Sequence, residues 1–438
     1  MRMIINVQGL IKNMILLDYH EMIVILFFYI FGFSIIGTLT SRDLLIPIFG
    51  ILYLFDKPFR VEIHQLFRIK KIIKIFILII SLAFYSIVIS IFRNTYDYEV
   101  PKKLISLFLN LFLGIFVFAM YKKNEKSERI VVHLLYIFIV QSSIQFLSFS
   151  IPEVNKILDI FRTDLTINVR QRYADMRGLS ISGVTFFMLA AGYGMIYILF
   201  FENIKKIFPN RFWGKILVLI LLLFGGLSAG RTAIVGFGMG FGYFLYRNII
   251  NTTNLKLPKI YLRSIILGVL LSILLLSVAI LILDISALSI KIQNFIRFSF
   301  EYIYNFLELD QLRTSSTDHL FNDMYFKIPK STILFGDGFY VNSDGSYYMH
   351  TDAGYMRNIL YFGIVGFVLL FVLQVYMLSW DRGNRFLSFV LLVYILVIHI
   401  KGDVLGYSTI IQDILFLILL RNIKFETSPN RTRGIHAI

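Results

Sequence analysis

Long apolar runs, separated by short polar and mostly basic segments, recur from about residue 22 to about residue 420. A run of roughly 18 or more apolar residues can cross the hydrocarbon core of a bilayer, which is about 30 Å thick. Lipid offers no hydrogen-bond partners, so only helices or closed barrels span it, and these runs are too long and continuous for barrel strands. The pattern therefore predicts an all-α polytopic membrane protein in which residues 1–438 form one integral membrane domain.

The apolar runs predict about 12 transmembrane helices (11–12). The segment 43–55 is short, and the pair 216–229 and 232–246 is separated only by a polar turn that contains Arg231. Basic clusters lie on both sides of this pair, so the pair must cross the membrane twice, with Arg231 at the outer turn. The expected spans are 22–39, 43–55, 73–92, 104–120, 130–149, 179–201, 216–229, 232–246, 264–284, 355–379, 386–400 and 404–420.

Charge orients these spans. With both termini in the cytoplasm, the inner segments carry 26 of the 43 Lys and Arg residues but only 9 of the 27 Asp and Glu residues. This asymmetry is the positive-inside pattern of an integral membrane protein with both termini in the cytoplasm. The net charge of +16 is therefore mostly a consequence of topology. It does not indicate a nucleic-acid partner; the bilayer itself is the expected partner.

The longest segments between spans are the two predicted outer loops, 150–178 and 285–354. Because the extra mass lies on the outer side, we expect the protein to act there. The second loop opens with apolar residues at mostly helical spacing over 290–306. This stretch is either an interfacial helix lying on the membrane or a helix packed on the bundle.

Arginines on the outer side are the first candidates for ligand binding. Arg172 and Arg177 belong to the first loop, and a guanidinium binds phosphate through two parallel hydrogen bonds. The alternative is that these arginines pair with the aspartates interleaved among them. Arg231 lies between two apolar helices, where a charge is costly and usually functional, unless its side chain extends to the interface.

The densest polar cluster ends the second loop and contains His350 and Asp352, with Arg357 about one turn inside the next helix. Histidine is a natural general base near neutral pH, whereas Asp352 is equally well explained as a helix N-cap. Late in the chain, loop polarity suffices to explain His399, Lys401 and Asp403.

Several classes of chemistry are absent from the sequence. Without cysteine the chain has no disulfide, thiolate metal site or cysteine nucleophile. It also contains no Walker-type phosphate loop, no HExxH, no GxSxG and no cytoplasmic DxD pair. We therefore expect no metal and no cofactor, and we exclude ATP-driven and zinc-protease chemistry.

Four segments of the sequence resemble motifs of one known family. They are 227–233 (Leu-Ser-Ala-Gly-Arg-Thr-Ala), 334–338 (Leu-Phe-Gly-Asp-Gly), 350–355 (His-Thr-Asp-Ala-Gly-Tyr) and 363–366 (Gly-Ile-Val-Gly). Together with Met-Arg-Gly at 176–178 and the large late outer loop, they resemble the O-antigen polymerases and the related O-antigen ligases. Arg172 and Gly183 also match the Arg-x10-Gly spacing of polymerase outer loops.

The resemblance implies a metal-independent glycosyltransferase with a GT-C-like fold that polymerises glycans linked to undecaprenyl diphosphate. It implies that Arg231 and Arg357 bind the diphosphate, with Arg177 and Arg172 assisting. His350 would deprotonate or orient the acceptor, and Asp352 would align His350. A chain-length regulator and a flippase of the same pathway are possible partners. An O-antigen ligase and a lipid-linked glycan flippase remain the alternatives.

Overall fold

The structure is a computed structural model that describes residues 19–173, 175–207, 212–251, 289–311, 313–380 and 385–423, and it is mostly helical. Within these ranges, six helical segments are long and apolar enough to cross a membrane. They are α5 (Lys70–Phe92), α6 (Glu99–Lys123), Ser127–Ser150 with α7 (Ile130–Ser150), α10 (Phe186–Asn203), α11 (Phe212–Ala229) and α18 (Gly354–Met377). The prediction of an all-α membrane protein is confirmed at this level.

Shorter elements complete the described part of the chain. The remaining helices are α2 (Tyr19–Phe31), α3 (Ser41–Phe55), α4 (Lys57–Phe67), α8 (Pro152–Leu158), α9 (Asp164–Arg172), α12 (Ala233–Asn251), α14 (Ile290–Ser299), α15 (Glu301–Leu309), α16 (Ser315–His319), α17 (Lys330–Phe335), α19 (Arg385–His399) and α20 (Thr409–Asn422). Single turns lie at Ser127–Arg129, Asp159–Phe161, Leu320–Met324 and Tyr348–His350, and a two-stranded hairpin pairs β1 (Ser34–Ile36) with β2 (Leu39–Thr40).

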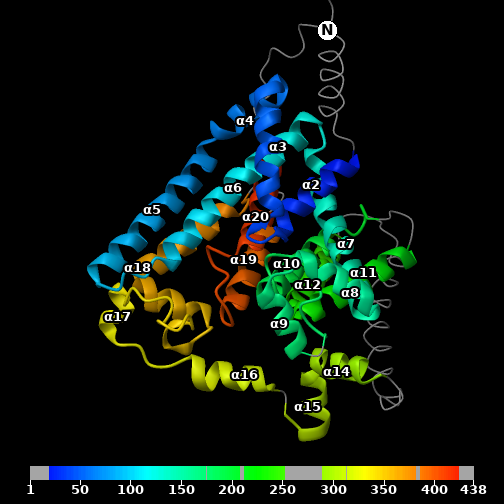
Figure 1. The fold of residues 1–438 in the computed structure, drawn as a ribbon, viewed down its shortest axis with the longest axis vertical. Helices are drawn as coiled ribbons and strands as arrows, with labels where there is room; N and C mark the ends of the chain where they lie inside the picture. The colour runs from blue at the N-terminus through cyan, green and yellow to red at the C-terminus, as the bar shows by residue number, and fades with distance from the viewer. Residues whose placement is uncertain are drawn as a thin grey trace, which may run out of the picture.

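Helix α20 lies at the centre of the molecule. Figure 1 shows α5, α6 and α18 grouped on one side and α7, α10, α11 and α12 on the other, with α19 and α20 between them. Every residue from Ile410 to Leu420 is buried, because α20 packs against α6, α7, α10 and α18. Asp413, one turn into α20, pairs with Arg42 at 2.7 Å and accepts a hydrogen bond from Tyr29. These contacts connect the first helices of the chain to the last.

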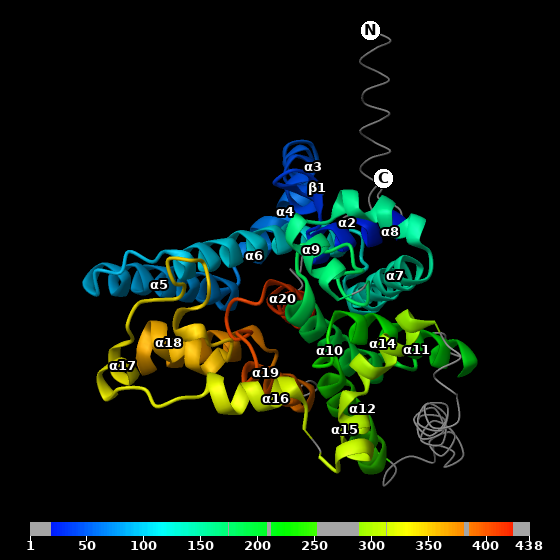
Figure 2. The same cartoon turned by 60° about the horizontal axis from the view of Figure 1, so that its bottom comes forward.

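Segments expected on the outer side of the membrane meet at one end of the helices. Thr95, in the turn between α5 and α6, donates to the Gly338 carbonyl at 2.8 Å. The Tyr325 hydroxyl donates to the Ile400 carbonyl, also at 2.8 Å. Figure 2 shows α9 and the helices from α14 to α17 at this end of the molecule.

Segments expected on the inner side meet at the opposite end. Lys122, at the end of α6, pairs with Glu62 of α4 at 2.7 Å. Arg421, at the end of α20, lies 3.6 Å from Glu128. The basic and acidic residues of different inner segments therefore contact one another, as expected if these segments share one side of the bilayer.

The first predicted span, 22–39, is shorter than expected. Helix α2 ends at Phe31, and the polar residues Ser34, Thr38 and Thr40 belong to the hairpin β1–β2. The apolar residues of this hairpin extend the apolar run of the sequence beyond the end of the helix. The predicted span 264–284 lies outside the described residues.

Two later spans also begin after their predicted starts. Helix α10 begins at Phe186 rather than at residue 179, because the preceding segment runs extended against the end of α2. There the Gly183 amide donates to the Phe31 carbonyl at 2.9 Å, and a Cβ at Gly183 would lie 2.4 Å from the Gly32 carbonyl oxygen. Helix α20 begins at Thr409 rather than at residue 404, after an irregular turn.

Helix α18 agrees with the predicted span 355–379 but is broken inside. Gly363 has φ +66°, a conformation that an L-residue rarely adopts. The break exposes main-chain carbonyls, which accept hydrogen bonds from the segment after α17. Asp337 donates to Leu360 at 2.6 Å and Gly338 donates to Tyr361 at 3.2 Å. Two motifs that are well separated in sequence, 334–338 and 363–366, therefore lie against each other.

The apolar stretch 290–306 forms two helices instead of one. Helix α14 packs on the bundle, where Phe295 lies with its ring centroid 5.1 Å from that of Phe224. Helix α15 leaves apolar side chains such as Phe306 and Leu307 exposed, as expected for a helix at the membrane surface. The packed alternative therefore describes α14, and an interfacial position of α15 stays a prediction.

The closest helix packing in the described chain predicts a sharp stability difference between two glycines of α12. A Cβ at Gly236 would lie 2.2 Å from the Gly194 backbone of α10, whereas a Cβ at Gly238 meets nothing within 4 Å. We expect Gly236→Val to separate α10 from α12 and to lower stability by about 1–3 kcal/mol or more. The measurement is thermal unfolding in detergent with Gly238→Val as control, and equal midpoints would contradict this packing.

Candidate functional site

Arg177 and Arg231 both lie against one aromatic ring. Arg231 lies in the turn between α11 and α12, and Arg177 follows α9 in the first outer loop. Their guanidinium carbons lie 4.9 Å and 5.4 Å from the Phe298 ring centroid. Arg177 also donates to the Ala229 carbonyl at 3.0 Å. Cation–π contact with the same ring holds the two like charges close together.

Lys401 completes a group of three cations. It belongs to the turn between α19 and α20, and its Nζ donates to the Ser316 hydroxyl at 2.9 Å. Burial, followed by the positive charges of Arg231 and Arg177, lowers the pKa of Lys401 to about 8. We call Arg177, Arg231 and Lys401 the cationic cluster.

Two acids face the cationic cluster without neutralising it. Glu301 of α15 forms an ion pair with Arg231, and it also accepts from the Ser315 amide at 3.2 Å. The charge of Asp352 acts on Lys401 and raises its pKa, but less than burial and the arginines lower it. Three cations therefore face two carboxylates.

Arg177 has unused hydrogen-bonding capacity. Its buried Nε has no hydrogen-bond partner, although its guanidinium is surrounded by Tyr173, Phe186 and Phe298. Burial lowers the pKa of both Arg177 and Arg231, but a guanidinium remains charged at neutral pH because its ordinary pKa lies far above 7. Fixed guanidinium groups with free donors, partly withdrawn from water, form a site suited to a phosphate or diphosphate.

Arg357 lies in a different environment from the cationic cluster. Its guanidinium carbon lies 3.9 Å from the Tyr340 ring centroid and 3.6 Å from that of Tyr347. The side chain is buried, and Nε and Nη2 have no hydrogen-bond partner. Tyr340 in turn donates to Asp403 at 2.6 Å. The structure therefore places Arg357 in an aromatic and acidic pocket at the start of α18.

His350 and Asp352 follow each other closely in sequence but contact different groups. His350 lines a cavity of about 500 Å³ with Asp344, and both Met349 and His350 have positive φ, at +55° and +53°. Positive φ at two non-glycine residues is strain of the kind found at functional sites. Asp352 is exposed on the side of Lys401. Within the described chain, no hydrogen bond joins His350 to Asp352.

Arg172 is exposed at the end of α9, whereas neighbouring arginines of the same loop are buried in ion pairs. Arg162 and Arg170 both pair with Asp159, at 2.9 Å and 2.8 Å. The alternative that the first loop's arginines serve to pair with its aspartates therefore applies to these two.

Sequence reasoning attributed Lys401 to loop polarity alone and missed Phe298. Lys401 had one available signal, because a lysine in an outer turn is unexpected under the positive-inside rule. Phe298 had none, since it is one of many phenylalanines. The described chain contains no group of three acidic or histidine side chains arranged to hold a metal ion.

Comparison with known proteins identifies no relative. No protein family, no curated protein and no solved structure matches this chain.

The lowered pKa of Lys401 predicts a pH-dependent contribution to anion binding. Lys401 is charged below about pH 8 and loses its charge as the pH rises through that value. At pH 7 we expect Lys401→Met to weaken binding of inorganic pyrophosphate about tenfold or more, because one charged hydrogen bond is lost. The ratio of wild-type to Lys401→Met affinity should approach one above pH 9.

Isothermal titration calorimetry of the detergent-solubilised protein measures both affinities. Pyrophosphate itself changes charge with pH, and this affects both proteins equally. The ratio of the two affinities therefore cancels that effect. A ratio independent of pH would contradict a role for the Lys401 charge.

Proposed function

We propose that this protein is a polysaccharide polymerase of the O-antigen, capsule or exopolysaccharide type, which joins undecaprenyl-diphosphate-linked repeat units on the outer side of the bacterial inner membrane. The observation that carries the proposal is the convergence of Arg177, Arg231 and Lys401. A lipid diphosphate at the membrane surface has the charge that such a site would bind. The resemblance of the motifs around Arg177 and Arg231 to those of O-antigen polymerases supports it.

The proposal includes a topology finer than the six spans described above. It has about twelve spans in a GT-C-like arrangement, with both termini in the cytoplasm. The basic segments predicted to be cytoplasmic lie at the opposite end of the helices from the cationic cluster, which supports this orientation. The shorter apolar helices α2 and α19 supply two of the further spans.

In the proposed reaction, a sugar hydroxyl of one repeat unit attacks the anomeric carbon of the growing chain. The bond from that carbon to the diphosphate oxygen breaks, and undecaprenyl diphosphate leaves with the electron pair. The cationic cluster stabilises the developing negative charge. No metal takes part.

Asp352, beside Lys401, accepts the hydroxyl proton in this scheme, and His350 binds the acceptor sugar at its own cavity. Arg357, stacked on Tyr340 and Tyr347, positions the loop that carries His350. Arg172, which is exposed, attracts the anionic donor from outside the site. A chain-length regulator and a flippase of the same pathway are the proposed partners.

Two alternatives use the same geometry differently. An O-antigen ligase would transfer the finished chain to another lipid, and the cationic cluster would suit its donor equally well. A lipid-linked glycan flippase would need charges that line a path across the membrane. The cationic cluster instead lies at the helix ends, which favours an enzyme.

Deletion of the gene in its native host tests the reaction. We expect the long-chain ladder of surface polysaccharide to disappear, while a single repeat unit remains attached to its carrier. Gel electrophoresis of the polysaccharide is the measurement. Lipid-linked long polymer accumulating in the membrane would indicate the ligase, and an unchanged ladder would exclude both enzymes.

Complementation of that strain tests the site. Arg177→Gln and Arg231→Gln should each reduce polymer at least about tenfold. Each substitution removes a positive charge that stabilises the negative charge developing on the leaving group. Arg313→Gln is the control, since Arg313 is an exposed arginine at the same end of the molecule. Immunoblotting verifies protein levels, and normal polymer from a stable Arg231→Gln protein would refute the assignment.

A further inference from the structure

A long groove lies between α3, α4 and α6, in a part of the molecule that the proposed function does not use. Its volume is about 1200 Å³, above the roughly 300–1,000 Å³ typical of pockets for small molecules. Lining side chains such as Ile46, Leu109 and Phe112 are exposed, at 61%, 58% and 39%. Exposed apolar side chains on membrane helices face lipid, so the groove opens sideways into the bilayer.

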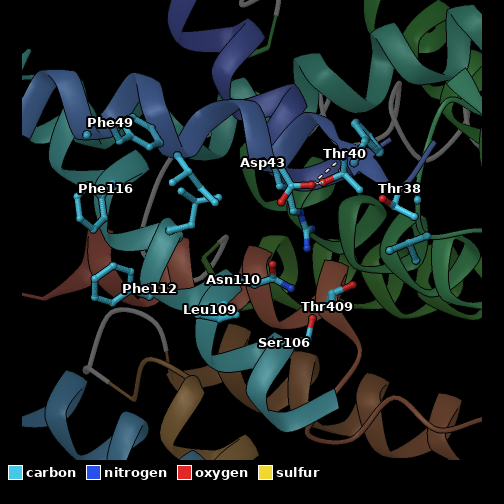
Figure 3. A pocket seen from close by; sticks show the side chains of 18 of the residues that line it. Thr38, Thr40, Asp43, Phe49, Ser106, Leu109, Asn110, Phe112, Phe116 and Thr409 are labelled. Carbon is cyan, nitrogen blue, oxygen red and sulfur yellow. Dashed lines mark hydrogen bonds between the residues drawn. The ribbon is translucent and has the colours of Figure 1, made fainter. Parts of the chain in front are cut away.

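The groove has two chemically different halves. Figure 3 shows the rings of Phe49, Phe112 and Phe116 on one side of the labelled set and polar side chains on the other. The aromatic half suits a flexible hydrocarbon chain. From Asp43 to Tyr53, α3 extends roughly 15 Å along the groove, about half of the hydrocarbon thickness. The polar residues that line the groove include Thr38, Thr40, Asp43, Ser106, Asn110 and Thr409.

Hydrogen-bond acceptors are available in the polar half. One carboxylate oxygen of Asp43 accepts from the Thr40 amide and hydroxyl, each at 2.8 Å, which leaves its other oxygen for a ligand. An ordinary residue at position 47 would donate its N–H to the Asp43 carbonyl, one turn earlier in the helix. Pro47 has no N–H, so this carbonyl lacks its usual helical hydrogen bond. Asn110 lies about 16 Å into α6 from its start at Glu99 and presents a further polar side chain to the groove.

The charge of the polar half excludes an anionic ligand. The positive charge of Arg42 is paired with buried Asp413, and its Nε donates to the Tyr29 carbonyl. Asp43 then leaves this end of the groove negative. A phosphate would be repelled here, whereas a head that donates hydroxyl hydrogen bonds is complementary.

We propose that this groove binds a membrane lipid with a hydroxyl-bearing head that carries no negative charge. One hydrocarbon chain lies along the aromatic half, and the head donates hydrogen bonds to Asp43 and its polar neighbours. The site is separate from the cationic cluster and does not depend on the proposed function.

Photolabelling tests the proposal. Diacylglycerol that carries a diazirine on one acyl chain is added to full-length protein in phosphatidylcholine nanodiscs. After photolysis, mass spectrometry locates the labelled peptides. We expect label on peptides of α3, α4 and α6. Excess dioleoylglycerol should compete for it more effectively than dioleoyl phosphatidate, which has the same chains and an anionic head.

Two substitutions fill the groove from opposite walls. A Cβ at Gly50 meets nothing within 4 Å, so Gly50→Phe places a ring in open space, and Leu109→Trp enters from α6. Each should reduce labelling of the three helices about tenfold or more, because a side chain replaces the lipid chain. Gly238→Phe, at an equally open glycine outside the groove, should label as the wild type does.

Leu109→Trp gives an independent measurement if Gly50→Phe does not fold. Two results together would overturn the proposal: labelling of the exposed face of α5 as strong as that of the groove, and unchanged labelling in the folded groove variant. They would show that the label reports contact with general bilayer lipid only. Stronger competition by phosphatidate than by dioleoylglycerol would overturn the assignment of the head.

Discussion

Main-chain hydrogen bonding where the membrane helices break is the constraint on which this structure depends. An unpaired N–H or C=O group in hydrocarbon costs several kcal/mol, so each break needs a partner from elsewhere in the protein. At the end of α2 the partner is the Gly183 amide, and at the break in α18 it is the segment of Asp337 and Gly338. These pairings hold the C-terminal ends of the two predicted outer loops at fixed places against the helices.

The position of the cationic cluster follows from these fixed ends. Arg177 comes shortly before the segment that pairs with α2, and its hydrogen bond to the Ala229 carbonyl joins it to the turn of Arg231. Phe298 then lies against both guanidinium groups. An aromatic face lowers the energy of a cation without removing its charge, so the cluster can be partly buried and still attract an anion.

The two candidate sites differ in sign for a structural reason. Arg42 is paired with Asp413 in the centre of the bundle, and its charge is used to connect α2, α3 and α20. The arginines of the cationic cluster contact rings, and only Arg231 forms an ion pair. The same side-chain type therefore supports the fold in one place and offers charge to a ligand in the other, according to its nearest acid.

Hydropathy along the chain sufficed to predict the all-α membrane architecture and the approximate positions of the six helices that are long and apolar enough to cross a membrane. Both depend on the transfer free energy of each segment, which is a local quantity. The sequence also singled out Arg177 and Arg231. The extended segment before α10, the hairpin after α2 and the break at Gly363 required the folded structure, because each is stabilised by hydrogen bonds to distant residues.

Only the tertiary structure separated Arg357 from the cluster and added Lys401 to it. Arg357 and Arg231 have similar sequence surroundings, since each lies next to an apolar helix on the predicted outer side. Their partners, Tyr340 and Tyr347 in one case and Phe298 in the other, come from different parts of the second outer loop. Which ring meets which arginine depends on how that long loop folds over the helix ends, and packing between segments far apart in the chain decides it.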